Sequence, residues 1–401
     1  MTLPPFPVSP ARPRTDAGAP AATYALRAGR MFDGFTLSGP VTVHVRRDRV
    51  LAVDRTGSVP TGVPLIDLGD HVCLLPGLVD VRAHLAFDAG PDPVGSLAAA
   101  DDEGLLARMR VAARTALHAG VTTVRDVGDR GFLASALAEQ TAADPALGPE
   151  ILAAGPPITT PGGHGHRLGG ETVGPRALVD AVRERHARGC ALVTIIASGD
   201  VRTPGSDPGR TQYTRGELRT VADEAHRLGL PVAAHAHAAV AIEDALAAGV
   251  DSLEHASFLG GHGAVEELRL LALVAGSGTF VSMTPVREPG PYADGVHAAY
   301  RALIRLGARF AVGSDAGTTS ARPHNSLPSA PLELAALGAS PLEALKAVTS
   351  QAAALCGLGS RKGRIRAGAD ADFLAVTGDP LTGLAALRDV RAVFRAGVRI
   401  R

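Results

Sequence analysis

Lysine is scarce in this chain of 401 residues. Only two of its 40 basic residues are lysines, Lys346 and Lys362, and both lie near the C-terminal end. The preference for arginine agrees with a composition rich in Ala, Arg, Gly and Pro. Whatever its origin, it excludes any chemistry that needs a lysine side chain before residue 346.

The chain also lacks an excess of one charge, long apolar segments and paired cysteines. Its 40 acidic residues balance the 40 basic ones, so no net field favours nucleic acid or a membrane surface. No apolar run reaches the roughly 18–20 residues of a spanning helix. Cys73, Cys190 and Cys356 form neither a CxxC pair nor an obvious disulfide framework. We expect a cytoplasmic protein that acts on a small molecule. The sequence allows either a monomer or a homo-oligomer.

The two ends of the chain differ from its middle. Residues 1–21 are rich in Pro and Ala and carry almost no large apolar side chains, which predicts a disordered tail without the apolar core of a secretory signal. Residues 22–75 contain short alternating β-type runs, and residues 362–401 return to the same character. We therefore predict one small composite β-sandwich domain assembled from both ends.

Between them, residues 76–361 alternate strand-like apolar runs with Ala- and Leu-rich helical stretches. This α/β pattern, with eight candidate strands, predicts a (β/α)₈ TIM-like barrel, and a doubly wound open sheet is the alternative on pattern alone. The candidate strands are 78–85, 122–127, 150–154, 191–197, 231–235, 252–255, 279–283 and 309–312.

Imidazole and carboxylate side chains recur where these strands end, which is where barrel enzymes place their active sites. His84 follows the first strand, His235 ends the fifth, His255 ends the sixth and Asp315 follows the eighth. A single histidine on an apolar strand is usually a core residue. Several that converge on one rim together with a carboxylate indicate a divalent metal site that activates water.

These residues stand in segments that resemble the amidohydrolase superfamily, within it the imidazolonepropionase/prolidase-like group. The matching segments, in chain order, are PGLVDVRAH (76–84), AGVTTVRDVG (119–128), PGGHGH (161–166), AHAH (234–237), DSLEH (251–255), GSDAGT (313–318), SPLEALKAVTSQAAALCGL (340–358) and AGADADFLAV (367–376). The resemblance implies a metal-dependent hydrolase with an HxH motif after strand one and a carboxylated lysine on strand four. It further implies one histidine after each of strands five and six and a catalytic aspartate on strand eight.

Carried over, the resemblance makes His84, His235, His255 and Asp315 the metal ligands, and Asp315 also the catalytic residue. Two positions depart from the pattern: Arg82 replaces the first histidine of HxH, and Thr194 replaces the lysine. A guanidinium stays charged and does not ligate metals. We therefore expect Arg82 to pair with Asp315, and one zinc ion, or another divalent metal, in place of two.

Other residues receive weaker interpretations. Arg82, His164, Tyr213 and His237 are tentative substrate-binding residues; for His164 a flexible surface loop is the alternative. His237 stays outside the predicted ligand set because we expect its strand to end at His235. For Arg125 and Asp126 we favour an interior ion pair over substrate contact.

Two functions from different classes follow. The leading hypothesis is a metal-dependent amidohydrolase that hydrolyses a C–N bond of a small molecule, such as a dipeptide or a cyclic amide. The alternative is a metal-free descendant of the barrel that is catalytically silent or has been repurposed for binding or for non-hydrolytic chemistry. Fold alone does not decide between them, since barrels host many chemistries.

Overall fold

The computed structural model describes residues 23–56, 58, 61–260 and 264–401. The predicted tail at 1–21 lies outside the described residues. Eleven α-helices and eighteen strands are assigned in the described part of the chain. None of these helices combines the length and the apolar character that crossing a membrane requires.

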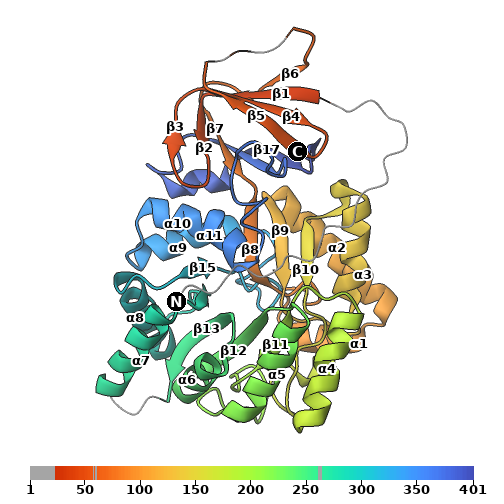
Figure 1. Cartoon of the computed structure of the whole chain (residues 1–401), viewed down its shortest axis with the longest axis vertical. Coiled ribbons are helices and arrows are strands. Elements are labelled where there is room, and N and C mark those ends of the chain that lie inside the picture. Colours follow the sequence, from red (N-terminus) through yellow and green to blue (C-terminus); the bar gives the residue numbers. More distant parts are fainter. Residues whose placement is uncertain (1–22, 57, 59–60, 261–263) are drawn as a thin grey trace.

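Eight parallel strands form the core of the middle region (Figure 1). They are β8 (Leu78–Ala83), β9 (Val121–Asp126), β10 (Glu150–Ala153), β11 (Val193–Ile196), β12 (Val232–Ala238), β13 (Ser252–Leu259), β14 (Phe280–Met283) and β15 (Phe310–Val312). Their ladders run β10-β9-β8 and β11-β12-β13-β14-β15. Single parallel bridges, Ile158–Ile195 and Ala83–Ala316, join the two sheets at both seams. The predicted TIM-like architecture is confirmed, with a ladder that is not continuous at the seams.

Helices alternate with these strands and cover their outer face (Figure 1). Local sequence explains their starts: α5 begins after a capping box in which Thr214 and Glu217 bond reciprocally. The helices are α1 (Pro93–Ala99), α2 (Asp102–His118), α3 (Leu133–Ala143), α4 (Pro175–Ala187), α5 (Arg215–Arg227), α6 (Ala239–Ala248), α7 (Ala264–Ser277), α8 (Pro291–Arg305), α9 (Ala330–Ala336), α10 (Pro341–Ala347) and α11 (Ser350–Leu355), with 3₁₀ turns at Pro145–Leu147, His166–Leu168, Leu327–Ser329 and Leu384–Arg388.

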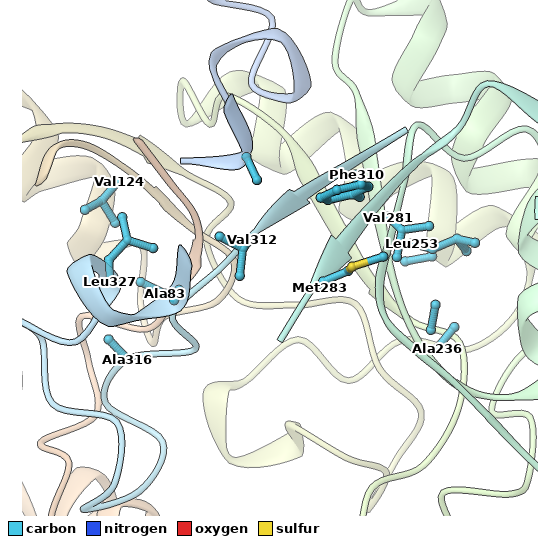
Figure 2. Packing of buried hydrophobic residues seen from close by; sticks show 14 of the residues in the cluster. Ala83, Val124, Ala236, Leu253, Val281, Met283, Phe310, Val312, Ala316 and Leu327 are labelled. Atoms are coloured by element: carbon cyan, nitrogen blue, oxygen red, sulfur yellow. The ribbon is translucent and has the colours of Figure 1, made fainter. Parts of the chain in front are cut away.

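Apolar and polar side chains alternate along the barrel strands, as a period of two requires. Leu253 of β13 packs in the main hydrophobic cluster with Val281 and Met283 of β14 (Figure 2). Their neighbours Ser252, Glu254 and Ser282 are buried and polar. The apolar side chains thus face the helices, which leaves the polar ones for the barrel interior.

The barrel interior carries a buried ionic network. Arg125 of β9 donates to Ser252 Oγ at 3.1 Å and to Glu254 Oε1 at 2.5 Å, both on β13. Because β9 and β13 belong to different sheets and are not neighbours, these side chains meet across the interior. The predicted interior ion pair of Arg125 is therefore present, but its partner is Glu254. Asp126 instead accepts the backbone N–H groups of Leu85 and Gly128.

Strands from both ends of the chain pair with one another at one end of the barrel (Figure 1). One sheet has the order β5 (Arg49–Asp54), β4 (Val41–Arg46), β1 (Thr23–Ala28) and β6 (Leu65–Asp67). The other has the order β18 (Val398–Arg399), β17 (Val390–Arg395), β16 (Phe373–Thr377), β7 (Val72–Pro76), β2 (Arg30–Phe32) and β3 (Leu37–Ser38). A shared apolar cluster that includes Leu26, Val43, Phe373 and Phe394 packs between them.

A cluster of buried charges ties this β region to the barrel. Lys362 Nζ lies 3.1 Å from carboxylate oxygens of both Glu150 and Asp370, and it also pairs with Asp372. Arg361 pairs with Glu150 and Asp370. Burial alone would lower the pKa of Lys362, but the carboxylates outweigh burial and raise it. Lys362, one of the two lysines of the chain, thus has a structural role at the end of the barrel opposite the carboxyl ends of its strands.

Candidate active site

Four imidazoles converge at the carboxyl ends of the barrel strands. His235 and His237 lie on β12, His255 lies on β13, and His164 comes from the loop after β10. Ring centroids of His235 lie 4.7 Å from His164, 4.6 Å from His237 and 4.9 Å from His255. The three strand residues are buried, His235 at 1% exposure. Of the histidines that the sequence placed on this rim as ligands, His235 and His255 lie in this group.

β12 runs further than the sequence suggested. We expected it to end at His235, but it continues to Ala238, where it pairs with Leu259 of β13 after a register irregularity. Residues two apart on one strand share a face, so His237 points to the same side as His235. His237 therefore belongs to the histidine group.

Three of the four imidazoles are oriented by hydroxyl groups. Their Nδ1 atoms lie within hydrogen-bond distance of a hydroxyl oxygen in the pairs His164–Thr203 at 2.9 Å, His237–Ser257 at 2.8 Å and His255–Thr284 at 2.6 Å. A hydrogen bond at one ring nitrogen fixes the orientation of the ring, and the lone pair of the other nitrogen can then bind a proton or a metal ion. This arrangement is typical of metal-ligating histidines, although it also occurs in hydrogen-bonded cores.

The backbone around His255 has an unusual conformation, and the hydroxyl group of Tyr300 stabilises it. His255 has a φ of 67° and Ala256 a φ of 50°, both in the left-handed region. The buried Tyr300 hydroxyl donates to the carbonyl oxygen of His255 at 2.6 Å and accepts the N–H of Thr284 at 3.1 Å. Tyr300 on α8 thereby supports both His255 and the residue that orients its ring.

Asp200 is the residue that sequence reasoning missed. It follows β11 in the segment Ala197-Ser-Gly-Asp, and its Oδ2 atom lies 3.0 Å from His237 Nε2, 3.8 Å from His235 Nε2 and 4.0 Å from His164 Nε2. Burial would raise the pKa of Asp200, but the hydrogen bond with His237 and the neighbouring imidazoles hold it well below its ordinary value. The one sequence signal that could have identified Asp200 was its position in a loop after a barrel strand.

His235 is the least satisfied side chain of the group. Neither its Nδ1 nor its Nε2 has a hydrogen-bond partner, although the ring is buried. Burial, followed by the other histidines, drives the pKa of His235 well below its ordinary value, so the ring is neutral and one of its nitrogens can accept. An unpartnered buried polar atom costs about 1–3 kcal/mol, which argues for a ligand there.

Two sets of side chains have the spacing of a metal site, and both contain His235. One is His235, His237 and His255; the other is His164, Asp200 and His235. Within each set the ligand atoms lie within 4.8 Å of one another. Imidazole nitrogens with a carboxylate are ligands that suit Zn²⁺ and related divalent ions. The residues present therefore fit one divalent ion.

Arg82 occupies the place of the first HxH histidine and pairs with Asp315, as predicted. Its Nε donates to Asp315 Oδ1 at 3.0 Å, and its Nη1 lies 3.7 Å from Glu254 Oε2. Arg202, from the loop after β11, donates to Asp315 Oδ2 at 3.4 Å. Both oxygens of Asp315 are thus engaged by guanidinium groups.

This pairing sets the electrostatics of the second half of the site. Burial would raise the pKa of Asp315, but Arg82, Arg202 and Arg322 outweigh it and lower the pKa. His84 Nε2 lies 3.8 Å from Asp315 Oδ1, and burial together with Arg82 lowers the pKa of His84 to about 4. At neutral pH the carboxylate is ionised and the imidazole is neutral.

The predicted ligand set is only partly brought together. His235 and His255 share a set, whereas His84 and Asp315 belong to neither of the two sets found in the described residues. Thr194 lies on β11 as expected, with its Oγ1 buried and unpartnered. Ligation by His84 and Asp315 stays a prediction, and Arg82 competes for the same carboxylate.

The other sequence candidates divide in two. His164 is part of the histidine group, which favours the site over the surface-loop alternative. The Tyr213 hydroxyl donates to the carbonyl of Thr172 at 2.7 Å, so it is engaged away from the histidines. A histidine outside these candidates, His324, supports the site indirectly, because its Nε2 lies 3.3 Å from the carbonyl oxygen of His84.

Comparison with known proteins agrees with this geometry. The sequence profile of the amidohydrolase family matches residues 73–400. The chain belongs to the amidohydrolase family. As a member of this family it is a hydrolase of carbon–nitrogen bonds. The family generally uses a divalent metal ion.

Similar proteins extend over most of the chain. An ochratoxinase of Aspergillus niger is 28% identical over 369 residues, which cover 80% of this chain and 73% of the relative. Among solved structures, a Xaa-Pro dipeptidase with bound methionine has a TM-score of 0.83 at 24% identity, covering 94% of this chain and 99% of the other. The A. niger ochratoxinase structure has a TM-score of 0.80 at 23% identity, with coverage of 94% and 95%. At this identity the structural likeness shows the fold.

Proposed function

We propose that this amidohydrolase cleaves an amide-type C–N bond of a small molecule with one divalent ion, most simply zinc. The observation that carries the proposal is the group of four imidazoles and Asp200 around the unpartnered nitrogens of His235. Arg82 and Thr194, where the family pattern has two ligands, argue against a second ion. When bound, such an ion supplies Lewis acidity, which activates water and polarises a carbonyl.

Asp315 has the role of a proton carrier in this proposal. It is ionised and aligned by Arg82, so its oxygen can accept a proton from the attacking water. Because the arginines hold its pKa low, the proton does not stay on the carboxylate. It is returned to the leaving nitrogen, which completes the hydrolysis.

The charge near Asp315 favours a substrate that carries a carboxylate. Arg322 donates to the carbonyl oxygens of Ser314 and Pro285, and within the described chain no carboxylate lies at ion-pair distance from it. The Arg202 side chain is 38% exposed and can reach a ligand. Arg82, Arg202 and Arg322 outnumber the carboxylates of Asp315 and Glu254 here, which leaves positive charge that suits a dipeptide or an N-acyl amino acid. The dipeptidase among the structural relatives supports this class of substrate.

The test combines metal content with activity. Protein purified without chelator is analysed by plasma mass spectrometry beside a His235→Ala/His255→Ala variant, and both are assayed on dipeptides, N-acyl amino acids and cyclic amides. About one zinc per chain, lost in the variant, with hydrolysis that chelator abolishes and zinc restores, is expected. Protein that hydrolyses none of these amides and takes up no added zinc would overturn the proposal and favour the metal-free alternative.

The carboxylate preference has its own measurement. An N-acyl amino acid is compared with its C-terminal carboxamide, and Arg202→Met is compared with the wild type. We expect the carboxamide to raise KM, and Arg202→Met to remove the difference between the two substrates. Equal KM values for acid and carboxamide in the wild type would show that the guanidiniums do not select the substrate.

A further inference from the structure

Asp200 lies in the loop that follows the strand with the family's lysine position. Thr194 stands within β11 at that position, and its neutral hydroxyl supplies no negative charge to a cation. Asp200 comes six residues after Thr194, and its carboxylate contacts His237 on β12. The chain thus provides a carboxylate from the same strand end, displaced from the place where the family pattern has it.

We propose that Asp200 is the anionic metal ligand of this chain, together with His164 and His235, the set whose ligand atoms lie within 4.8 Å of one another. We name this set the Asp200 group: Asp200, His164 and His235. The inference rests on the proposed function, since it assigns the ligands of the same ion. It places the ion on the side of β11 and β12, where Asp200 and not Asp315 supplies the carboxylate ligand.

The spacing of the Asp200 group suits a small divalent ion. The Nε2 atoms of His235 and His164 lie 3.8 and 4.0 Å from Asp200 Oδ2, and a hydrogen bond of 3.0 Å with His237 Nε2 orients the same oxygen. Ligand atoms bound tetrahedrally at about 2.0–2.2 Å from zinc are separated by about 3.2–3.6 Å. Both distances are slightly above that value, so a small movement of the rings brings the group to coordination distance.

Asp200 is also held in a fixed orientation. Its Oδ1 accepts the backbone N–H of Arg202 at 2.8 Å, and its own N–H donates to Ser206 Oγ at 3.2 Å. This leaves Oδ2 for the imidazoles. Gly199 allows the loop to close, because a Cβ at this position would lie 2.3 Å from the carbonyl oxygen of Asp207. A carboxylate with one oxygen tied back and the other presented is the usual orientation of a metal ligand.

The opposite side of the site repels a cation. Asp315 is engaged by Arg82 and Arg202, and a guanidinium keeps its charge at working pH. The Asp200 group combines imidazoles with a carboxylate that has no arginine at ion-pair distance in the described chain.

The experiment compares two isosteric carboxylate variants of the full-length protein. Zinc affinity of the apoprotein is measured by competition with a chromogenic chelator for wild type, Asp200→Asn and Asp315→Asn, with folding checked by circular dichroism. His164→Ala is the second variant, because His164 belongs to the Asp200 group alone. Cobalt(II) absorption spectra of the same proteins report the ligand set without any assay of activity.

We expect Asp200→Asn to weaken zinc binding at least 30-fold and to change the cobalt spectrum, and His164→Ala to weaken it about 10-fold. Asp315→Asn should change the affinity less than 3-fold. The reverse order, with metal lost in Asp315→Asn and retained in Asp200→Asn, would overturn the inference while the metal-dependent function stands. A wild type that binds neither zinc nor cobalt would overturn both.

Discussion

Breaking the ion pair between Arg82 and Asp315 should destabilise the protein markedly. Both side chains are buried, at 5% and 4% exposure. Removal of one partner of a buried pair costs about 3–5 kcal/mol, because the other charge is left in a medium of low dielectric constant. Here Arg202 still faces Asp315 and Arg125 still faces Glu254, which reduces the loss. For Arg82→Met we therefore expect the free energy of unfolding to fall by about 2–4 kcal/mol.

The assay is equilibrium unfolding in urea, followed by circular dichroism, for Arg82→Met, Asp315→Asn and the double variant. Because the two groups contact each other, the cycle should show a coupling of about 1–3 kcal/mol. The control is Arg27→Met, which breaks an ion pair with Asp67 whose side chains are 48% and 43% exposed, and which should lower the free energy of unfolding far less. If Arg82→Met costs no more than this control, the claim that a fixed buried pair fills this half of the site is wrong.

Three further predictions concern other buried polar groups. Lys362→Met should lower the unfolding free energy by about 3–5 kcal/mol in urea titrations, since it leaves a cluster of buried carboxylates short of a cation; a loss below 1 kcal/mol would contradict this. Burial raises the pKa of Asp129 above its ordinary value, so the folded protein holds a proton there more tightly than the unfolded chain and loses stability as the pH rises above that ordinary value. Relative to wild type, Asp129→Asn should therefore gain unfolding free energy as the pH rises from 5 to 8, and a difference that does not change with pH would refute the assignment. Tyr300→Phe should cost about 1–3 kcal/mol because the Thr284 N–H loses its acceptor, with an unchanged melting temperature as the contrary result.

The sequence predicted the fold because the pattern repeats. Alternating apolar strands and amphipathic helices gave all eight barrel strands to within a few residues, and only β12 and β13 run clearly beyond the predicted ends. The pair of Arg82 and Asp315 was also predictable. Both flank neighbouring strand ends on one rim, and a buried guanidinium beside a carboxylate leaves few other arrangements.

The candidate site was less predictable. His237 was left out because the end of a strand depends on how many residues pair with the next strand, which the pattern does not specify. Asp200 was missed because it lies in a loop, where no periodicity indicates which way a side chain points. Nor did spacing suggest Glu254 as the partner of Arg125, since they meet across the barrel from strands that are not neighbours.

By itself the sequence determined which side chains reach the rim and which chemistry is absent from it. Parallel strands end at the same edge whatever the loops do, and a chain without lysine before residue 346 cannot form a lysine-bridged metal pair. Tertiary structure decided which rim side chains meet. His255 and Asp315 adopt left-handed backbone with φ of 67° and 53°, and the loop after β11 folds back over β12. Such details depend on packing between distant segments, so the division of the site into an arginine-paired half and an Asp200 half became visible only in three dimensions.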